Sequence, residues 1–503
     1  MAYICGVDLG TSSLKTLLMD EEGRVKGVCA KSYQFASPQG GFAEHDPSEW
    51  WEACCSTIQG VLKQSGISPE EVAGVSFSGQ MHGAVLLDEN YQVIRPAILH
   101  CDARSSQQVK WIKETLGEEY VRQWIMNPVY TGFLLPSLLW VRDHEPENYK
   151  KVRHVCLPKD YLKFRMSGEL SSDYSDASAT LAFDIVKGCW SREILDAVNV
   201  PIDIFPRCYN TAEAAGTVCG EASRETGLTC KTVVVAGGGD QVMQGIGNGA
   251  IQTGTATVNI GSSGQFSFQS GAPIMNKELN TNTFYGYEKG RWIVMGAIMN
   301  AGLSLKWVNN LLGQKDFVAI NEAVSKVRPG SGGVIFLPYL NGERTPHLNP
   351  NISGTFLGVN LQTGPAEMTR AVMEGVAYAL YQCMELCEGL GLKAQELIAS
   401  GGGARSMPWL QIQADIYNMP LKVADTEEQA GLGAAIAAGV GSGIYSSVQE
   451  GCQRAVRYKD FIVLPNSENH RIYQEYYKLY KETYQESKEV LEKVTVLGRN
   501  TGK

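Results

Sequence analysis

Two stretches of this chain, about 250 residues apart, repeat one pattern: a short strand, a turn rich in glycine and hydroxyl side chains, and a return strand. The two units cover residues 4–19, with the turn Gly10-Thr11-Ser12-Ser13, and residues 253–269, with the turn Gly261-Ser262-Ser263-Gly264. Such turns offer backbone N–H groups and hydroxyls to a phosphate. The repeat therefore predicts an α/β chain whose two related domains face each other across a cleft. For either unit alone, an ordinary hairpin is the alternative.

A single acid, Asp240, stands at the end of a glycine run close to the change-over between the two units. The run Gly237-Gly238-Gly239 follows residues 231–236, a β-branched stretch that is typical of a buried strand. Three glycines remove every side chain there and let another group approach the backbone closely. A carboxylate at the carboxyl end of a strand can accept a proton from a substrate hydroxyl. The next residue, Gln241, is an amide, so one acid is offered; the alternative is a glycine turn with an exposed Asp.

Polar side chains also follow other predicted strands. Asp8 lies beside the first hydroxyl-rich turn, where it could hold a magnesium ion, usually through water. The strand at 72–77 leads to Gln80 and His82, whose carboxamide and imidazole make directional hydrogen bonds to hydroxyls or a carbonyl. Asp102 follows a further strand and either caps the next helix or faces the same cleft. A loop histidine with satisfied hydrogen bonds is the alternative for His82.

A second triple glycine, Gly401-Gly402-Gly403, ends a strand at 397–400 and leads into a helix at 408–417. This arrangement suits the floor of a nucleotide site, with a mere tight turn as the alternative. The predicted helix at 366–380 has Gly375 in its middle. A glycine there costs roughly 1 kcal/mol relative to alanine, so we expect close packing of this helix against a neighbour.

Composition excludes several classes of function. The net charge is −9 without any basic block, so nucleic acid is not expected as a partner. The 13 cysteines include no Cys-x-x-Cys pair, which predicts reduced thiols in a cytoplasmic protein. Neither a signal peptide nor an apolar stretch of transmembrane length is found, so no membrane partner is expected. A lysine such as Lys159 is expected to be a solvated charge.

Six motifs occur together in chain order. They are Asp8-Leu9-Gly10-Thr11-Ser12, Gly79-Gln80-Met81-His82-Gly83-Ala84, Leu157-Pro158-Lys159-Asp160-Tyr161-Leu162, Gly237-Gly238-Gly239-Asp240, Gly342-Glu343-Arg344-Thr345-Pro346-His347 and Gly401-Gly402-Gly403-Ala404-Arg405. With these motifs, nearly the whole chain resembles the FGGY family of carbohydrate kinases, and within it the xylulokinases most. The resemblance implies an α/β fold of two actin-like (ribonuclease H-like) ATPase domains that face each other across a cleft.

The resemblance also implies an activity: ATP-dependent phosphorylation of a terminal sugar hydroxyl, first of all D-xylulose to D-xylulose 5-phosphate, with Mg²⁺. Asp240 would be the general base, and Asp8 would handle the metal and the transferring phosphate. The implied sugar contacts are Gln80, Met81, His82, Asp102, Asp240 and Gln241. The implied ATP contacts are Gly10, Thr11, Ser12, Gly261, Ser262, Gly401, Gly402, Gly403 and Ala404.

The expected domains are an N-terminal kinase domain with the sugar site at 1–246, a C-terminal kinase domain with the nucleotide site at 247–445, and a helical segment at 446–503. Cys101 and Gln241 depart from the family pattern near the sugar pocket, so a kinase for another ketose or polyol (ribulose, erythritol or glycerol) stays open. An actin-like ATPase acting on protein is a further alternative, although it needs no polar sugar cradle. The expected partners are the sugar and ATP, with a homodimer left open.

Overall fold

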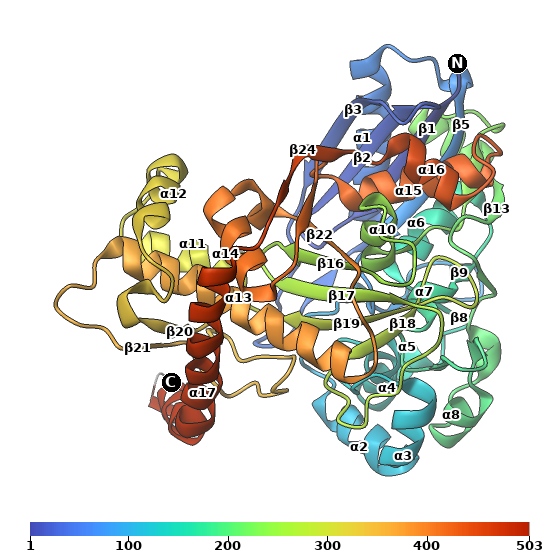
Figure 1. Cartoon of the computed structure of the whole chain (residues 1–503). Helices are drawn as coiled ribbons and strands as arrows, with labels where there is room; N and C mark the ends of the chain where they lie inside the picture. The colour runs from blue at the N-terminus through green and yellow to red at the C-terminus, as the bar shows by residue number, and fades with distance from the viewer. Residues whose placement is uncertain (502–503) are drawn as a thin grey trace.

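The computed structural model describes residues 1–501, which contain two large mixed sheets surrounded by helices (Figure 1). In the first sheet the strands are ordered β13-β14-β5-β1-β2-β3, and β15 pairs with β5. They are β1 (Tyr3–Leu9), β2 (Ser13–Asp20), β3 (Val25–Ser32), β5 (Val72–Gly79), β13 (Ala214–Thr217), β14 (Val233–Val235) and β15 (Gly238–Gly239). In the second sheet the order is β18-β19-β17-β16-β22-β23-β24. These strands are β16 (Thr255–Ile260), β17 (Gly264–Ser270), β18 (Asn282–Tyr285), β19 (Trp292–Ile298), β22 (Glu396–Ser400), β23 (Leu421–Ala424) and β24 (Tyr458–Val463).

The repeat predicted from the sequence is present in both sheets. β1 and β2 form an antiparallel hairpin, and β16 and β17 form another. Each hairpin is extended by an antiparallel strand on one side, β3 or β19. On the other side two parallel strands follow, β5 and β14 in the first sheet and β22 and β23 in the second. The prediction of two related α/β domains is confirmed by this shared succession of strands.

Two helices that lie far apart in the sequence pack on each other between the sheets (Figure 1). They are α10 (Asp240–Gly247) and α15 (Gln429–Gly441). A Cβ at Gly247 or Gly433 would overlap a backbone oxygen of the other helix, so this crossing requires glycine. A Cβ at Gly6 of β1 would likewise overlap α15. α15 belongs to the range expected for the C-terminal domain, yet it covers the first sheet, so the two domains share this layer.

Close packing of the long helix α13 (Pro365–Gly389) was predicted from its internal glycine and is confirmed. A Cβ at Gly375 would overlap the carbonyl oxygen of Phe336 in β20 (Ile335–Leu337). The helix is longer than predicted at its C-terminal end. Its buried side is part of the largest apolar core, which also includes inward-facing residues of β16, β17 and β22.

The expected helical segment at 446–503 contains a strand as well as helices. α16 (Val448–Ala455) is followed by β24, which pairs antiparallel with β23 and forms the edge of the second sheet. The expectation is therefore wrong for residues 458–463. Charged and exposed side chains such as Lys459 and Asp460 hide the strand pattern, as is common for edge strands.

The final helix α17 (Ser467–Thr501) is anchored by tyrosines along one face. The buried tyrosines are Tyr473, Tyr477, Tyr480 and Tyr484. The hydroxyl of Tyr473 donates to Glu374 Oε1 at 2.9 Å and accepts from Arg370 Nη2 at 2.7 Å, both on α13. The spacing of three and four residues puts these rings on one side of the helix. The tail is thus part of the second domain's core and not a purely solvated appendage.

The other elements complete the layers and connections. The longer helices are α1 (Pro47–Ser65), α2 (Ser106–Leu116), α4 (Leu134–His144), α6 (Pro158–Ser167), α9 (Gly220–Thr226), α11 (Gly302–Leu311), α12 (Phe317–Lys326) and α14 (Met407–Tyr417). The short helices are α3 (Glu118–Tyr120), α5 (Pro146–Tyr149), α7 (Tyr174–Ala177), α8 (Arg192–Ala197), η1 (Pro69–Glu71), η2 (Val121–Ile125), η3 (Ile202–Ile204), η4 (Ser331–Gly333) and η5 (Gly402–Arg405). The short strands are β4 (Glu44–His45), β6 (Val85–Leu87), β7 (Ala97–Ile98), β8 (His154–Cys156), β9 (Ser172–Asp173), β10 (Phe183–Asp184), β11 (Cys189–Trp190), β12 (Cys208–Tyr209) and β21 (Thr355–Leu357). Within residues 1–501, no helix has both the length and the apolar character required to cross a membrane.

Candidate active site

A cavity of about 310 Å³ lies where the ends of the two sheets face each other. Both halves of the chain contribute to its wall. The first half provides Gly10, Thr11, Gln80, Met81, His82, Asp240 and Gln241, and the second provides Ser263, Gln265, Asn282, Phe284 and Arg344. The cavity therefore brings together most of the side chains that the sequence marked at separate strand ends.

Asp240 is the first residue of α10 and is half-buried in the cavity wall. Burial and the nearby negative charge of Asp8 raise its pKa to about 7, although hydrogen bonds from Gln241 act in the opposite direction. A carboxylate with a pKa near the working pH can both accept and release a proton, which is what a general base requires. The geometry thus makes Asp240 suited to deprotonate a hydroxyl group in this cavity.

The glycines before Asp240 are required by the approach of neighbouring groups. Gly237 has φ +74°, and a Cβ there would overlap the carbonyl oxygen of Phe77 in β5. A Cβ on Gly239 would lie 2.8 Å from Cγ of Met81, which lines the cavity. The close approach predicted for this run is confirmed, and it brings the strand that precedes Met81 against the start of α10.

Asp8 lies behind the cavity, on β1, opposite Ser78 of the parallel strand β5. Burial raises the pKa of its carboxyl group, whereas the nearby side chain of Ser78 lowers it. Within the described chain, neither Asp8 nor Asp240 forms an ion pair with a lysine or arginine. Two neighbouring carboxylates without a basic partner, beside a hydroxyl-rich turn, are a donor set that fits hydrated Mg²⁺.

Gln80 and His82 present polar atoms to the cavity. Gln80 Oε1 accepts a hydrogen bond from Thr11 Oγ1 at 3.4 Å, while its buried Nε2 has no protein partner. His82 has φ +75°, and its Nδ1 donates to the carbonyl oxygen of Ala179 at 2.8 Å. Burial lowers the pKa of His82 to about 3, so the ring is neutral and its Nε2 is a hydrogen-bond acceptor. Both residues thus belong to the wall beside Asp240, although the unpaired Gln80 Nε2 is itself buried.

A second cavity, of about 480 Å³, adjoins the glycine run that follows β22. Gly401, Gly402 and Ala404 line it together with Lys15 of β2. Gly401 has φ +78°, and a Cβ on Gly403 would lie 2.6 Å from Ile260 at the end of β16, so this run needs glycine to pass so closely. Lys15, Arg405 and Lys459 line the cavity as well, each paired with an acid of the same wall, so the backbone N–H groups of the glycine turn are its main feature for accepting a polyphosphate.

Two family models describe the chain. The model of the N-terminal domain of the FGGY family of carbohydrate kinases matches residues 3–247, and the model of its C-terminal domain matches residues 256–442. The chain belongs to the FGGY family of carbohydrate kinases. The predicted architecture, two actin-like ATPase domains across a cleft, is confirmed, and the protein is a sugar kinase.

Relatives of this FGGY kinase are similar over almost its full length. It is 36% identical to the xylulose kinase of Staphylococcus epidermidis, over 97% of both chains. It is 33% identical to the xylulose kinase of Bacillus subtilis, over 95% of this chain and 96% of the relative. The crystal structure of a "xyloylose kinase" from Brucella ovis superposes with a TM-score of 0.90 at 31% identity, covering 97% of this chain and 100% of that one.

Among the positions predicted to bind ATP, Gly10 and Thr11 line the first cavity. Ser12 belongs to the same turn, and its carbonyl oxygen accepts from the backbone N–H of Tyr33. Gly261 and Ser262 form the corresponding turn of the second hairpin, where their carbonyls accept from the backbone that begins α11. Neither lines the first or the second cavity, although the next residue, Ser263, lines the first one. Their roles in binding ATP stay predictions.

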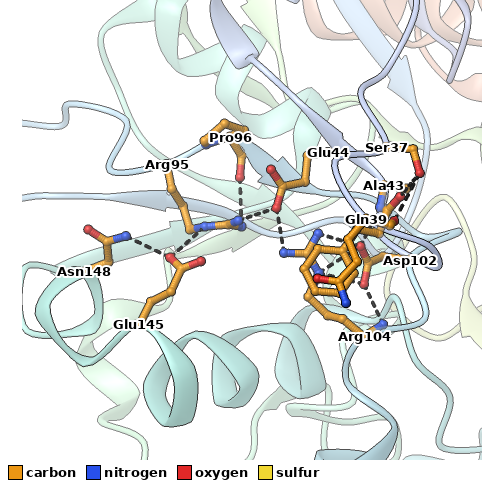
Figure 2. A network of polar contacts seen from close by, with 11 residues as sticks. Ser37, Gln39, Ala43, Glu44, Arg95, Pro96, Asp102, Arg104, Glu145 and Asn148 are labelled. Carbon is orange, nitrogen blue, oxygen red and sulfur yellow. Dashed lines mark hydrogen bonds and ion pairs between the residues drawn. The ribbon is translucent and has the colours of Figure 1, made fainter.

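Asp102 lies in a separate buried network (Figure 2). Its carboxylate accepts from the backbone N–H of Ala43 at 2.6 Å and forms an ion pair with Arg104 Nη2 at 2.8 Å. Arg104 also pairs with Glu44, which in turn pairs with Arg95. Asp102 is not among the residues that line the kinase's first cavity. The structure thus assigns it a role in holding a loop, and a contact with the sugar stays a prediction.

Lys159 was expected to be a solvated charge, and this expectation is wrong. Its side chain is completely buried, with the ammonium group paired to Asp160, to Asp173 at 2.8 Å and to Asp176 at 3.3 Å. Asp160 is its neighbour on α6, whereas Asp173 and Asp176 lie at the start of α7, so only the fold could show that these two acids meet the lysine.

Arg344, His100 and Tyr130 are among the residues of the first cavity that sequence reasoning did not assign to the site. Arg344 lies within one of the six motifs, so a polar loop with an arginine between two domains could have been noticed. His100 and Tyr130 lie outside these motifs, and no pattern in the sequence distinguishes them from other loop residues.

Proposed function

We propose that this kinase transfers the γ-phosphoryl group of ATP to the 5-hydroxyl of D-xylulose, giving ADP and D-xylulose 5-phosphate. The sugar is inferred from relatives named xylulose kinase that align over almost the entire chain. The observation that carries the mechanism is the carboxylate of Asp240, which has a pKa of about 7 in a cavity shared by both domains. Because ATP is the phosphoryl donor, we place the enzyme in the cytoplasm.

In this mechanism Asp240 accepts the proton of the attacking hydroxyl. The hydroxyl oxygen forms a bond to the γ-phosphorus as the bond between that phosphorus and the β,γ-bridging oxygen breaks, and ADP leaves. Such transfer depends on positioning and charge stabilisation more than on covalent chemistry. Proton removal by a positioned base typically contributes about 10² to 10⁴ in rate.

The sugar would lie among the polar atoms beside Asp240. His82 Nε2 would accept from a sugar hydroxyl, because the other ring nitrogen already donates to Ala179, and Gln80 would contact the sugar from the same wall. Met81 and Gln241 line the same wall. These contacts would hold the substrate with its terminal hydroxyl next to the base.

The nucleotide would span the two cavities, with its adenosine over Gly401–Ala404 and its phosphates toward the hydroxyl-rich turns that follow β1 and β16. A magnesium ion held at Asp8 would neutralise phosphate oxygens. Lys15 lines the nucleotide cavity, where its ammonium group pairs with Glu428 at 2.8 Å.

The test is ADP release with magnesium-ATP in the presence of D-xylulose, D-ribulose, L-ribulose, L-xylulose, erythritol, glycerol or gluconate. We expect kcat/KM to be greatest for D-xylulose. A clear preference for another acceptor would overturn the choice of sugar and make Cys101 and Gln241 the first positions to examine. ADP release that is indifferent to every acceptor would contradict the assignment of the cavity to a sugar.

A further inference from the structure

A buried chain of polar contacts runs from Lys159 to the backbone beside Asp240. Lys159 Nζ on α6 lies 2.8 Å from Asp173 Oδ1. Asp173 Oδ2 accepts from the backbone N–H of Ser175 at 2.7 Å and also from the Ser175 hydroxyl. Ser175 Oγ in turn accepts from the backbone N–H of Gly239 at 3.0 Å. The side chains of Lys159, Asp173 and Ser175 have no exposed surface.

The direction of each hydrogen bond in this chain is determined. A hydroxyl has one proton, and that of Ser175 goes to a carboxylate of Asp173, which can only accept. The lone pairs of Ser175 Oγ therefore face the N–H of Gly239. Burial alone would lower the pKa of Lys159. The three carboxylates around it, from Asp160, Asp173 and Asp176, outweigh that effect and hold its pKa well above the usual value. The ammonium group thus stays charged and compensates the carboxylate that orients Ser175.

The hydrogen bond from Gly239 to Ser175 lies next to Asp240 in the chain, where the backbone sets the orientation of its side chain. Gly239 is the residue before α10 and pairs with Gly79 of β5, while Gly238 pairs with Ser78. Ser78 in turn lies opposite Asp8. Lys159 also packs directly against β5, because a Cβ added at Gly79 would lie only 2.7 Å from the Cβ of Lys159. Two strands and the Ser175 hydroxyl therefore hold one short stretch of backbone.

A buried set of charges of this kind is weak evidence for stability, because well-packed apolar side chains of similar volume are often as stable or more so. It does impose a unique geometry on the groups that it contacts. Here the contacted group is the peptide N–H next to a carboxylate whose activity depends on its position relative to a bound hydroxyl.

We propose that Ser175, oriented by Asp173 and Lys159, is a positioning residue that fixes the start of α10 and thereby the direction of the Asp240 carboxylate. The inference rests on the proposed role of Asp240 as the base. Ser175 touches neither substrate nor metal in this scheme; it acts through the backbone of Gly239 alone.

The first test compares Ser175→Ala with a matched control, Thr226→Val. Thr226 is also completely buried, and its hydroxyl accepts from the N–H of Leu228 and donates to the carbonyl of Ala222, but it lies at the end of α9. We expect Ser175→Ala to lower kcat on the order of 10²-fold with little change in either KM, since small displacements of a catalytic group have effects of this size. Thr226→Val should change kcat little, even if it lowers the thermal midpoint of unfolding as much as Ser175→Ala does.

The proposal would be overturned if Ser175→Ala changed only KM, or if its kcat equalled that of the control. Asp173→Asn provides a second variant in case Ser175→Ala does not fold. Its amide keeps the shape but loses the pairing with Lys159, so kcat should fall in the same direction and by less. An unchanged kcat in a folded Asp173→Asn protein would also contradict the role of the chain.

Amide hydrogen exchange separates this inference from the choice of substrate. In Ser175→Ala, exchange across residues 238–247 should become faster, whereas in Thr226→Val that segment should match the wild type. Unaltered exchange across residues 238–247 in Ser175→Ala would contradict the positioning role, whichever sugar is the substrate. A wild-type enzyme without activity on any tested sugar would instead contradict the proposed function and leave the exchange result to decide the structural claim.

Discussion

At the scale of single residues, the chemistry of the site depends on how its side chains are surrounded. Asp240 is an ordinary carboxylic acid whose pKa is raised to about 7 by burial and by the charge of Asp8. His82 is an ordinary imidazole that burial keeps neutral, with its Nδ1–H given to a backbone carbonyl. Both groups thereby face a substrate as hydrogen-bond acceptors, which suits an acceptor rich in hydroxyls.

Replacing the base tests the central assignment. Asp240→Ala should lower kcat by about 10² to 10⁴ or more, because the attacking hydroxyl then loses its proton acceptor. Nucleotide binding should be largely retained, since the second cavity contains no atom of Asp240. Steady-state kinetics and calorimetric titration with ATP measure the two effects, and a variant with full activity would refute the assignment.

The pH dependence follows from the same residue. Asp240 must be deprotonated to act, so kcat/KM for the sugar should rise as the pH increases through about 7. Gln241→Leu removes a hydrogen bond that lowers the pKa of Asp240 and should move this limb to higher pH. Asp8→Asn removes a negative charge that raises the pKa of Asp240. The rise of the residual kcat/KM with pH should therefore occur at lower pH. Shifts in the same direction for both variants would contradict the stated causes.

Arg344 extends the site beyond the predicted residues. It is the only lysine or arginine among the described residues that line the first cavity, and its guanidinium group makes no hydrogen bond or ion pair with another described residue. We expect Arg344→Met to raise KM for the sugar roughly tenfold, the effect of losing a hydrogen bond to a charged group. Arg454→Met on α16, a surface arginine, is the control and should leave KM unchanged. Equal KM values would exclude a sugar contact by Arg344.

At the scale of elements, glycine decides how closely the helices approach. α10 and α15 cross with Gly247 and Gly433 directly against backbone oxygens of the partner helix. Of the nearby glycines, Gly247 serves this packing, whereas Gly249 lies just beyond the end of α10 with φ +73°. Because α10 starts at Asp240, the crossing also supports the position of the base.

A substitution at the crossing should be costly. Gly247→Ala forces α10 and α15 apart and should destabilise the protein by about 1 to 3 kcal/mol, as overpacking typically does. Gly389→Ala at the end of α13 is the matched control, because a Cβ there meets no atom within 4 Å. Denaturant unfolding gives both values, and a Gly247→Ala variant as stable as the control would show that the helices can separate without loss.

At the scale of the whole molecule, two related sheets supply opposite walls of one site. Asp240 and His82 come from the first half of the chain, and Ser263 and Arg344 come from the second. Such an arrangement allows a sugar and a nucleotide to draw the domains together. Closure matters because water is a competing nucleophile that must be excluded from the phosphoryl group.

Ligand binding should therefore be cooperative. D-xylulose and a non-hydrolysable ATP analogue with magnesium, added together, should raise the thermal midpoint by more than the sum of their separate effects. If the two sites are independent, each ligand at one hundred times its Kd stabilises the folded protein by about 2.7 kcal/mol. The sum of these two effects is the reference for a non-cooperative protein. Small-angle X-ray scattering should show a smaller radius of gyration only with both ligands. Strictly additive shifts without compaction would contradict closure.

The two-domain plan and much of the site could be predicted from the amino-acid sequence. The repeated hairpins at 4–19 and 253–269 appear as equivalent strands, because strand and turn propensities are local properties of the chain. Gly10, Gln80, His82 and Asp240 could be predicted for the same reason, since each stands at a strand end next to glycine.

Which groups from different segments meet could be seen only in the folded chain. Lys159 looked like a surface charge until Asp160, Asp173 and Asp176 were found around it, and Asp102 proved to be paired inside a loop network. Arg344 enters the cavity from a loop of the other domain. The pKa of Asp240 depends on Asp8, which lies more than two hundred positions away, and no local pattern in a sequence records such a contact.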